Sequence, residues 1–112
     1  CEAMALGERL GMNPKKLADV MSASTARCWS VDTYNPVPGV MEGVPSANGY
    51  AGGFGSALME KDLTLAMSSA NAVKARTPLG AHAHQLYGLL CENGMSEKDF
   101  GVVYQYLMNA KK

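Results

Sequence analysis

Residues 27–62 read RCWSVDTYNPVPGVMEGVPSANGYAGGFGSALMEKD, and this stretch decides the fold. Between residues 31 and 55 it contains three prolines and six glycines, which exclude a continuous helix or a strand of useful length. Loops longer than about 12 to 15 residues are uncommon in compact domains unless they are functional or disordered. Disordered segments are poor in aromatic residues, but four aromatic residues lie in or beside this loop: Trp29, Tyr34, Tyr50 and Phe54. We therefore expect a packed, functional loop that leads into a helix.

Length and charge narrow the class of protein. The 112 residues suffice for one domain, and 47% of them are hydrophobic, so a core is available. Ten basic and ten acidic residues cancel, which argues against nucleic acid or an anionic membrane surface as a partner. No run of about 18 apolar residues is present, so we expect no transmembrane helix.

The three cysteines also constrain the environment. They are odd in number, widely spaced and without a C-x-x-C pair. This pattern argues against a disulfide framework or a zinc site, and it favours a reducing compartment. Cys28 follows Arg27, which could lower the pKa of its thiol, but a buried, inert cysteine is the commoner case.

The beginning of the chain suggests a fragment of a longer protein. The first residue is Cys1, and residues 2–10 are helix formers apart from Gly7, with Gly11 placed as a stop. No N-cap precedes this helix, so we expect it to continue from upstream sequence.

Four further helices follow from their start and stop signals. Asn13-Pro14 opens the second, a periodic run from Ser56 to about Lys74 forms the third, and Thr77-Pro78 opens the fourth. Ser96, with Asp99 three residues later, resembles a capping box for the last. The expected buried positions are Leu17, Val20 and Met21; Leu58, Met59, Leu63, Leu65, Ala66, Ala70 and Val73; Leu79, Ala83, Leu86 and Leu90; and Phe100, Val103, Tyr104 and Leu107. The sequence thus predicts an all-α domain of about five helices with one long aromatic loop.

Lys61 and Asp62 are the strongest local candidates for a site. At about 100° per residue, Asp62 falls inside the apolar arc of its helix and Lys61 falls at the edge. We expect Asp62 to point inward and to hold the loop by accepting backbone N–H bonds, and Lys61 to reach over the aromatic residues. The alternatives are a solvated lysine and a purely structural acid.

Other candidate sites are weaker. Gly52-Gly53-Phe54-Gly55 precedes a helix, but it lacks the G-x-G-x-x-G spacing and a preceding strand, so a plain turn competes with a phosphate loop. His82 and His84 lie two apart on a helix and diverge by about 200°, so they cannot chelate one metal. His82 borders the apolar stripe and is expected to pack there. No metal site is expected.

A family resemblance accompanies these features. The pattern RCWS-x-DTYNPVPGVMEGVPSANGY-x-GGFG-x-x-LM-x-KDL-x-LA resembles the carboxy-terminal domain of the β-hydroxyacid dehydrogenase family, over essentially the whole chain. KDL-x-LA is a mark of the family at large. The run from Trp29 to Tyr50, with DTYNPVPGV, resembles the 3-hydroxyisobutyrate dehydrogenases within it.

The resemblance implies a fold and an activity. It implies a helical domain of the 6-phosphogluconate dehydrogenase C-terminal type over residues 1–112, for substrate binding and dimerisation, behind an amino-terminal Rossmann domain that binds NAD. The full-length enzyme would oxidise 3-hydroxy-2-methylpropanoate to methylmalonate semialdehyde in valine breakdown, in the mitochondrial matrix of eukaryotes or the bacterial cytoplasm. The family's catalytic lysine, in G-x-G-x-x-x-K-x-x-x-N, is absent from this chain and would lie upstream. This chain alone would be inactive.

The resemblance also assigns residues. Lys61, Asp62 and Phe54 correspond to residues on the nicotinamide side of the pocket, and Trp29 and Tyr34 to residues that line the substrate pocket. Ser68 stands where the family often has aspartate, so a role for that acid is not carried over. A homodimer or homotetramer is implied.

Two alternatives remain from the sequence. A related family member could act on tartronate semialdehyde, glyoxylate or serine. A chain of another class, a non-catalytic helical module, could use the aromatic loop to dock a protein partner.

Overall fold

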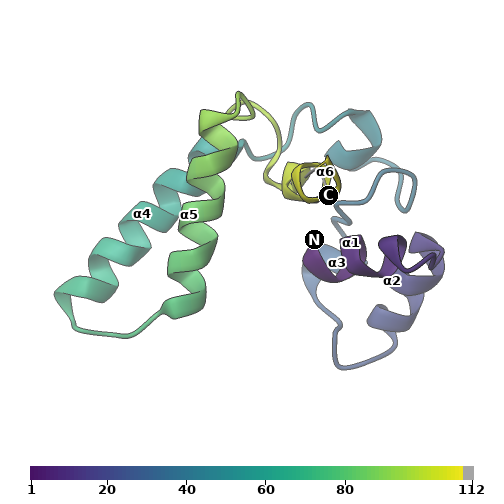
Figure 1. Cartoon of the computed structure of the whole chain (residues 1–112), viewed down its shortest axis with the longest axis horizontal. Helices are drawn as coiled ribbons and strands as arrows, with labels where there is room; N and C mark the ends of the chain where they lie inside the picture. Colours follow the sequence, from purple (N-terminus) through teal and green to yellow (C-terminus); the bar gives the residue numbers. More distant parts are fainter. Residues whose placement is uncertain (110–112) are drawn as a thin grey trace.

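The fold is all-α, as predicted, in a computed structural model that describes residues 1–109 (Figure 1). Its elements are α1 (Glu2–Arg9), α2 (Pro14–Ser22), α3 (Trp29–Asp32), η1 (Pro45–Asn48), α4 (Ser56–Ala72), α5 (Pro78–Glu92), η2 (Phe100–Val102) and α6 (Val103–Asn109). The five predicted helices correspond to α1, α2, α4, α5 and α6. The long loop adds the single turn α3 and the short 3₁₀ helix η1.

Local signals set most helix ends where the sequence predicts them. The Asn13 side chain accepts a hydrogen bond from the Lys16 backbone N–H at 3.1 Å, and Pro14 occupies the first helical position. Gly11 and Gly94 follow α1 and α5 with φ of +85° and +76°, a left-handed conformation that glycine adopts without steric cost.

The long loop is packed through its own polar groups. Asn35 is buried, and its side-chain oxygen accepts from the Val37 N–H at 3.1 Å, while the Ser46 hydroxyl donates to the Asn35 carbonyl at 2.7 Å. The Tyr50 hydroxyl donates to the Pro36 carbonyl at 2.8 Å. Because buried polar groups need partners, these bonds replace the regular ladder that prolines and glycines prevent.

Two small cores hold the helices together. The first joins α1, α2, α6 and the loop, and contains Met4, Ala5, Ala18, Val37 and Tyr104. The second joins α5, η2, α6 and the loop, and contains Tyr50, Leu90, Val102 and Val103. Within the first core, the Tyr104 hydroxyl donates to the Glu8 carboxylate, which ties α6 back to α1. The predicted burial of Val103, Tyr104 and Leu90 is confirmed.

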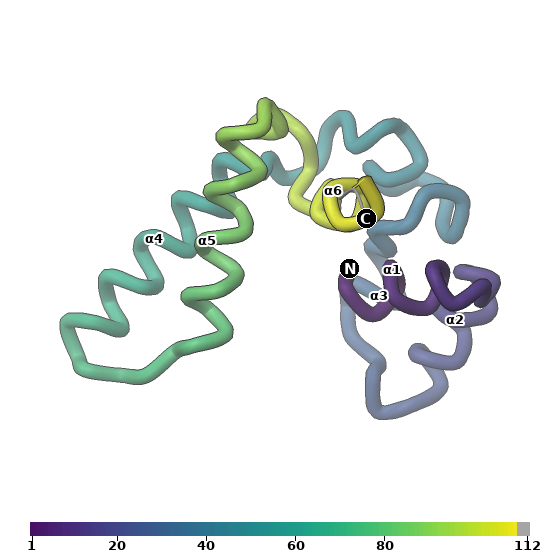
Figure 2. The backbone as a smooth tube through the Cα atoms, viewed as in Figure 1, coloured from purple at the N-terminus to yellow at the C-terminus, as the bar shows by residue number. Residues whose placement is uncertain are grey.

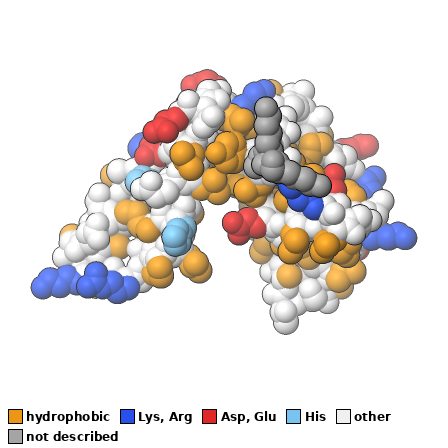
Figure 3. All heavy atoms as spheres, viewed as in Figure 1, with side chains coloured by type: hydrophobic (Ala, Val, Ile, Leu, Met, Phe, Trp, Pro, Cys, Tyr) orange, Lys and Arg blue, Asp and Glu red, His pale blue; other side chains and the backbone are white. Residues whose placement is uncertain are grey.

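Helices α4 and α5 form an antiparallel hairpin that projects from the rest of the molecule (Figures 1 and 2). The predicted burial along this hairpin is largely wrong, because each helix buries only the side that contacts the other. Exposed apolar side chains include Leu58, Leu65, Val73 and Leu79. In α2, Val20 is exposed as well. A space-filling view shows the molecule hollowed between the hairpin and the part that contains α1, α2 and α3, with apolar side chains on both sides (Figure 3).

The last helical segment starts differently from the prediction. Asp99, and not Ser96, is its N-cap, since the Asp99 side chain accepts from the Gly101 N–H at 2.9 Å. Thr77 precedes α5 as predicted, but its hydroxyl contacts the Met67 sulfur instead of capping the helix. Across residues 1–109, none of the helices has both the length and the apolar character needed to cross a bilayer.

Candidate functional site

Four aromatic rings form one cluster between the long loop and η2, three of them stacked and the fourth set edge-to-face. Trp29 stacks on Tyr34 with ring centroids 4.8 Å apart, and Tyr34 stacks on Phe100 at 5.6 Å. Phe54 meets the edge of Phe100 at 6.4 Å. The structure therefore brings together the three aromatic residues predicted for the site, Trp29, Tyr34 and Phe54, through a fourth that was expected only in the core.

The outer end of the stack is open to solvent. Trp29 is 58% exposed although one of its faces covers Tyr34. A planar apolar surface of this kind suits a flat or apolar ligand, because burying it removes aromatic area from water. We call the surface formed by Trp29, Tyr34, Phe54 and Phe100 the aromatic wall.

Asp99 holds the aromatic wall from behind. This residue is 1% exposed, and its Oδ2 accepts from the Tyr34 hydroxyl at 2.8 Å and from the Phe54 N–H at 2.9 Å. The Asp99 N–H donates to the Tyr50 carbonyl at 2.9 Å, and the Phe100 N–H donates to the Phe54 carbonyl at 2.8 Å. A buried carboxylate is tolerated when donors surround it, and here those donors come from the loop.

The Tyr34 hydroxyl is committed to Asp99. Burial, and then the hydrogen bond to the Asp99 carboxylate, raise the pKa of Tyr34 to about 12. Its proton is therefore retained and donated to Asp99 at neutral pH. The Tyr34 ring is part of the aromatic wall, and its hydroxyl group points to the Asp99 carboxylate.

Stability is expected to fall at alkaline pH because of three tyrosines. Burial is the main cause that raises the pKa values of Tyr34, Tyr50 and Tyr87 to about 12, from an ordinary value of 10.0. Their contribution is complete below pH 10, and it is lost as the pH rises through about 12, because the unfolded chain releases these protons first. Urea midpoints followed by circular dichroism should decrease across this interval. Constant midpoints up to pH 12 would contradict the three shifts.

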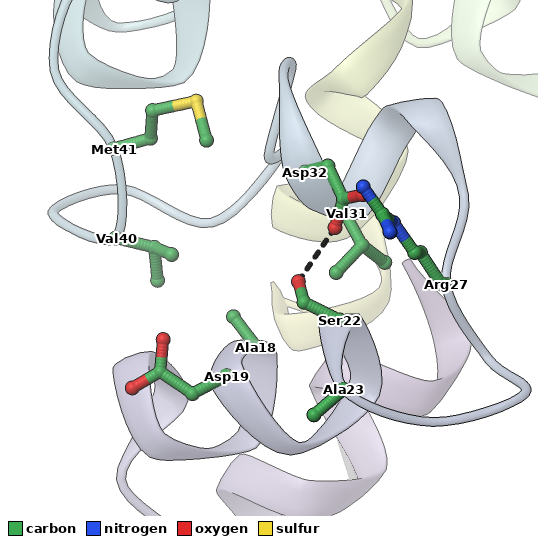
Figure 4. A pocket seen from close by; sticks show the side chains of 9 residues that line it. All are labelled: Ala18, Asp19, Ser22, Ala23, Arg27, Val31, Asp32, Val40 and Met41. Atoms are coloured by element: carbon green, nitrogen blue, oxygen red, sulfur yellow. Dashed lines mark hydrogen bonds and ion pairs between the residues drawn. The ribbon is translucent and has the colours of Figure 1, made fainter.

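The turn that carries Trp29 is fastened to α2. Asp32 accepts from the Ser22 hydroxyl at 2.6 Å and pairs with the Arg27 guanidinium at 2.6 Å (Figure 4). The Ser22 bond, and next the Arg27 bond, lower the pKa of Asp32. These groups border a shallow pocket of about 560 Å³ between α2, α3 and the loop at Val40. Both contacts hold α3, and with it the backbone that presents Trp29.

Lys61 and Asp62 lie outside the aromatic wall. The Lys61 ammonium pairs with the Asp62 carboxylate at 2.7 Å, and both side chains are exposed, at 59% and 50%. The expectation that Asp62 points inward and holds the loop is wrong. Over residues 1–109, the apolar arc of α4 that includes Asp62 is not covered by other residues there. The loop is held by the Asp99 carboxylate instead. Exposed ion pairs are worth about 0 to 1 kcal/mol, so Lys61 can exchange Asp62 for an anionic ligand at little cost.

The histidines have contacts within the hairpin. His84 Nε2 lies 2.8 Å from the Thr64 hydroxyl and 3.1 Å from the Glu60 carboxylate, and so joins α5 to α4. Both contacts use the same ring nitrogen, so the three groups do not form a relay. His82 is exposed, and its expected packing role is wrong. In residues 1–109, no group of three or more metal-ligating side chains is close enough to hold a metal ion.

Sequence reasoning missed two residues of the site, Asp99 and Phe100. Asp99 resembled the acid of a capping box, and Phe100 matched a core position of the last helix. The pair itself offered one signal. An acid that directly precedes an aromatic residue at the start of a helix can be a buried hydrogen-bond acceptor, with the aromatic ring held beside it. Only the fold shows that this pair lies beside residues 34 and 54.

Comparisons with known proteins agree with this picture. A family model described as "NAD-binding of NADP-dependent 3-hydroxyisobutyrate dehydrogenase" matches residues 1–107. The chain belongs to the 3-hydroxyisobutyrate dehydrogenase family. This membership confirms the resemblance read from DTYNPVPGV and KDL-x-LA.

Two curated members of the 3-hydroxyisobutyrate dehydrogenase family are close relatives. The mitochondrial 3-hydroxyisobutyrate dehydrogenases of Bos taurus and Homo sapiens are each 59% identical over 106 residues, which cover 95% of this chain. These residues are 32% of each relative's length, so the chain spans about a third of the curated relatives it matches.

A solved structure of the family shares the fold. The Mycobacterium tuberculosis 3-hydroxyisobutyrate dehydrogenase, described with L-serine, superposes with a TM-score of 0.89 at 40% identity. The match covers 95% of this chain and 36% of the solved one. The arrangement of helices described above is therefore that of a known dehydrogenase of this family.

Proposed function

We propose that this chain is the helical carboxy-terminal domain of an NAD-dependent 3-hydroxyisobutyrate dehydrogenase. The full-length enzyme oxidises 3-hydroxy-2-methylpropanoate to methylmalonate semialdehyde in valine degradation. The observation that carries the proposal is the aromatic wall with its open outer ring, in a chain of this family that also exposes Lys61 on α4. The amino-terminal Rossmann domain and the catalytic lysine belong to sequence upstream of residue 1.

The residues present fit the nicotinamide end of NAD. A nicotinamide ring is flat, and the exposed outer face of Trp29, the last ring of the stack, is a flat apolar surface. Phe54 lies at the cofactor side, and Lys61, about 8 Å along α4 from its start, offers a positive charge to the dinucleotide or to a substrate carboxylate. Asp62 acts through Lys61 by holding its ammonium when the cofactor is absent. The bound cofactor supplies the acceptor for the hydride.

Trp29 and Tyr34 form the substrate side of the pocket. Their rings exclude water and leave an apolar face for the methyl-bearing carbon of the hydroxy acid. Because the Tyr34 hydroxyl donates to Asp99, the substrate meets only the ring. The wall thus binds and orients the hydroxy acid, and the catalytic lysine upstream moves the proton.

Lys61→Ala in the full-length enzyme is expected to lower kcat/KM about tenfold, by removing an interaction with an anionic group in a desolvated cleft. Steady-state kinetics with NAD and 3-hydroxyisobutyrate would measure the effect as a higher KM or a lower kcat. Lys15→Ala, at an exposed lysine of α2, is the matched control and should leave kinetics unchanged. Equal kinetics for both variants would remove Lys61 from the site.

A panel of substrates and cofactors tests the proposed function directly. The full-length protein is assayed with 3-hydroxyisobutyrate, serine and glycerate, and with NAD and NADP. We expect the highest kcat/KM for 3-hydroxyisobutyrate with NAD. Preference for serine or glycerate would place the enzyme elsewhere among the β-hydroxyacid dehydrogenases, and inactivity towards all three would favour a docking module.

The surroundings of the enzyme form part of the same proposal. The exposed apolar face of the α4–α5 hairpin suits a homodimer or homotetramer, which light scattering on the full-length protein would detect. The Bos taurus and Homo sapiens relatives are described as mitochondrial proteins. We place this enzyme in the mitochondrial matrix if its source is eukaryotic and in the cytoplasm if it is bacterial.

A further inference from the structure

Asp99 occupies a special place among the residues around the site. It does not belong to the aromatic wall, but it is linked to three of the wall's residues through one side chain, one backbone N–H and one peptide bond. Its Oδ2 accepts from the Tyr34 hydroxyl and from the Phe54 N–H, and Phe100 is its neighbour in the chain. The fourth ring, Trp29, rests on Tyr34. The carboxylate therefore fixes the Tyr34 side chain and the Phe54 backbone, and through Tyr34 it supports Trp29.

The position of this carboxylate leaves little freedom. Its other oxygen, Oδ1, accepts from the Gly101 N–H at 2.9 Å, so both oxygens are engaged. A Cβ at residue 101 would lie 3.0 Å from Oδ1, and one at Gly53 would meet Oδ2 and the Tyr34 hydroxyl. Glycine at both positions lets the backbone close around the carboxylate. Because its own position is fixed this closely, the Asp99 carboxylate can in turn fix the positions of Tyr34 and Phe54.

We propose that Asp99 is a positioning residue that sets the shape of the substrate pocket, and with it the choice among hydroxy acids, without touching the substrate. The inference rests on the proposed function. In that function, Trp29 and Tyr34 face the side of the hydroxy acid that differs between 3-hydroxyisobutyrate and serine. Moving the two rings changes how well a methyl group is accommodated, while the reacting carbon is oriented by residues upstream.

The test is Asp99→Asn in the full-length protein. Asparagine keeps the size of the side chain but has only one acceptor oxygen, so it can no longer accept from Tyr34 and Phe54 on one side and from the Gly101 N–H on the other. We expect the ratio of kcat/KM for 3-hydroxyisobutyrate to that for L-serine to change about tenfold. This ratio does not depend on the fraction of folded enzyme, so a purely structural role would not move it.

Ser56→Ala is the matched control. Ser56 is also fully buried, and its hydroxyl donates to the Lys98 carbonyl at 3.0 Å, next to Asp99, and not to a residue of the aromatic wall. We expect this variant to lower the melting temperature and to keep the substrate ratio within about twofold. If Asp99→Asn lowered the melting temperature and left the ratio unchanged, the proposal would be overturned.

Tyr34→Phe covers the case in which Asp99→Asn does not fold. This substitution removes one hydrogen bond to Asp99 and keeps the ring. The ratio should shift in the same direction, and in the double variant the two effects should not add, because they break the same link. An unchanged ratio in Tyr34→Phe, or full additivity in the double variant, would count against the proposal.

A second measurement does not depend on activity. Trp29 is the only tryptophan in residues 1–112, and subtracting the spectrum of the matching Trp29→Phe protein isolates its fluorescence in the full-length protein. Asp99→Asn should shift this emission and raise its quenching by iodide, and Ser56→Ala should change neither. If the enzyme oxidised no hydroxy acid, the proposed function would fail while this measurement still tested the positioning. Unchanged Trp29 emission in Asp99→Asn would overturn the positioning itself.

Discussion

Gly53→Ala is expected to reduce the free energy of unfolding by about 3 to 5 kcal/mol and to abolish most substrate binding. Gly53 has φ of +72°, which costs an L-residue about 1 to 2 kcal/mol. In addition, the new Cβ would overlap the Asp99 carboxylate, the Tyr34 hydroxyl and the ring of Pro45. Relieving these overlaps requires the loop at residue 53 to move away from the Asp99 carboxylate. Urea unfolding and a hydroxy acid titration would measure the two losses.

Gly52→Ala is the control for this prediction. Gly52 has φ of +78°, but a Cβ there would have nothing within 4 Å. This variant should therefore lose only the cost of backbone strain, about 1 to 2 kcal/mol, and retain binding. Equal losses for the two variants would mean that strain alone explains Gly53, and that the close approach to Asp99 has no energetic weight.

Leu90→Ala is expected to cost about 3 to 5 kcal/mol of stability. Leu90 is 0% exposed and packs in the second core beside Tyr50, Val102 and Val103. Removing its side chain leaves a cavity at the junction of α5, η2 and the loop, where the neighbouring residues belong to different segments and cannot close together easily. Denaturant unfolding followed by circular dichroism measures the cost.

The neighbouring residue is the control for Leu90. Leu89 is 46% exposed, so Leu89→Ala removes the same atoms with much less loss of buried area. We expect a cost below about 1 kcal/mol. If Leu89→Ala were as costly as Leu90→Ala, the surface of α5 would have to be covered by another part of the protein, such as a second subunit.

The helices were predictable because their signals are local. Asn13 caps α2 through its own side chain, Pro14 starts the helix, and Gly11 and Gly94 end α1 and α5 with left-handed backbone. Each of these signals acts within about four residues, so it needs no knowledge of the fold. The packing of the aromatic loop was also predictable, since a long loop rich in rings must pack against something.

The exposed position of Asp62 was not predictable in the same way. Periodicity tells which side of α4 is apolar, but it does not tell whether anything covers that side. In residues 1–109, Leu58 and Leu65 stay exposed on α4, and Asp62 stays exposed with them. The arc predicts a surface that could be buried, and the rest of the protein decides whether it is.

The role of Asp99 also depends on contacts distant in sequence. Its partners Tyr34 and Phe54 precede it by 65 and 45 residues. From the sequence, the acid looked like part of a capping box opened by Ser96, and it does cap the segment that begins at Phe100. The same carboxylate also accepts hydrogen bonds from Tyr34 and Phe54, and only the fold, which brings residue 99 beside the loop, shows this second role.

The distance between Asp99 and its partners also sets an order of events during synthesis on the ribosome. The loop emerges first, and the carboxylate that holds Phe54 follows 45 residues later. At about 5 to 20 residues per second, translation needs roughly 2 to 9 s for that interval. For those seconds the nascent chain carries three rings of the aromatic wall, Trp29, Tyr34 and Phe54, without the carboxylate that supports them. Chaperones that bind exposed aromatic segments would find their target there, and a ribosome that stalls before residue 99 would release a chain unable to close its own loop.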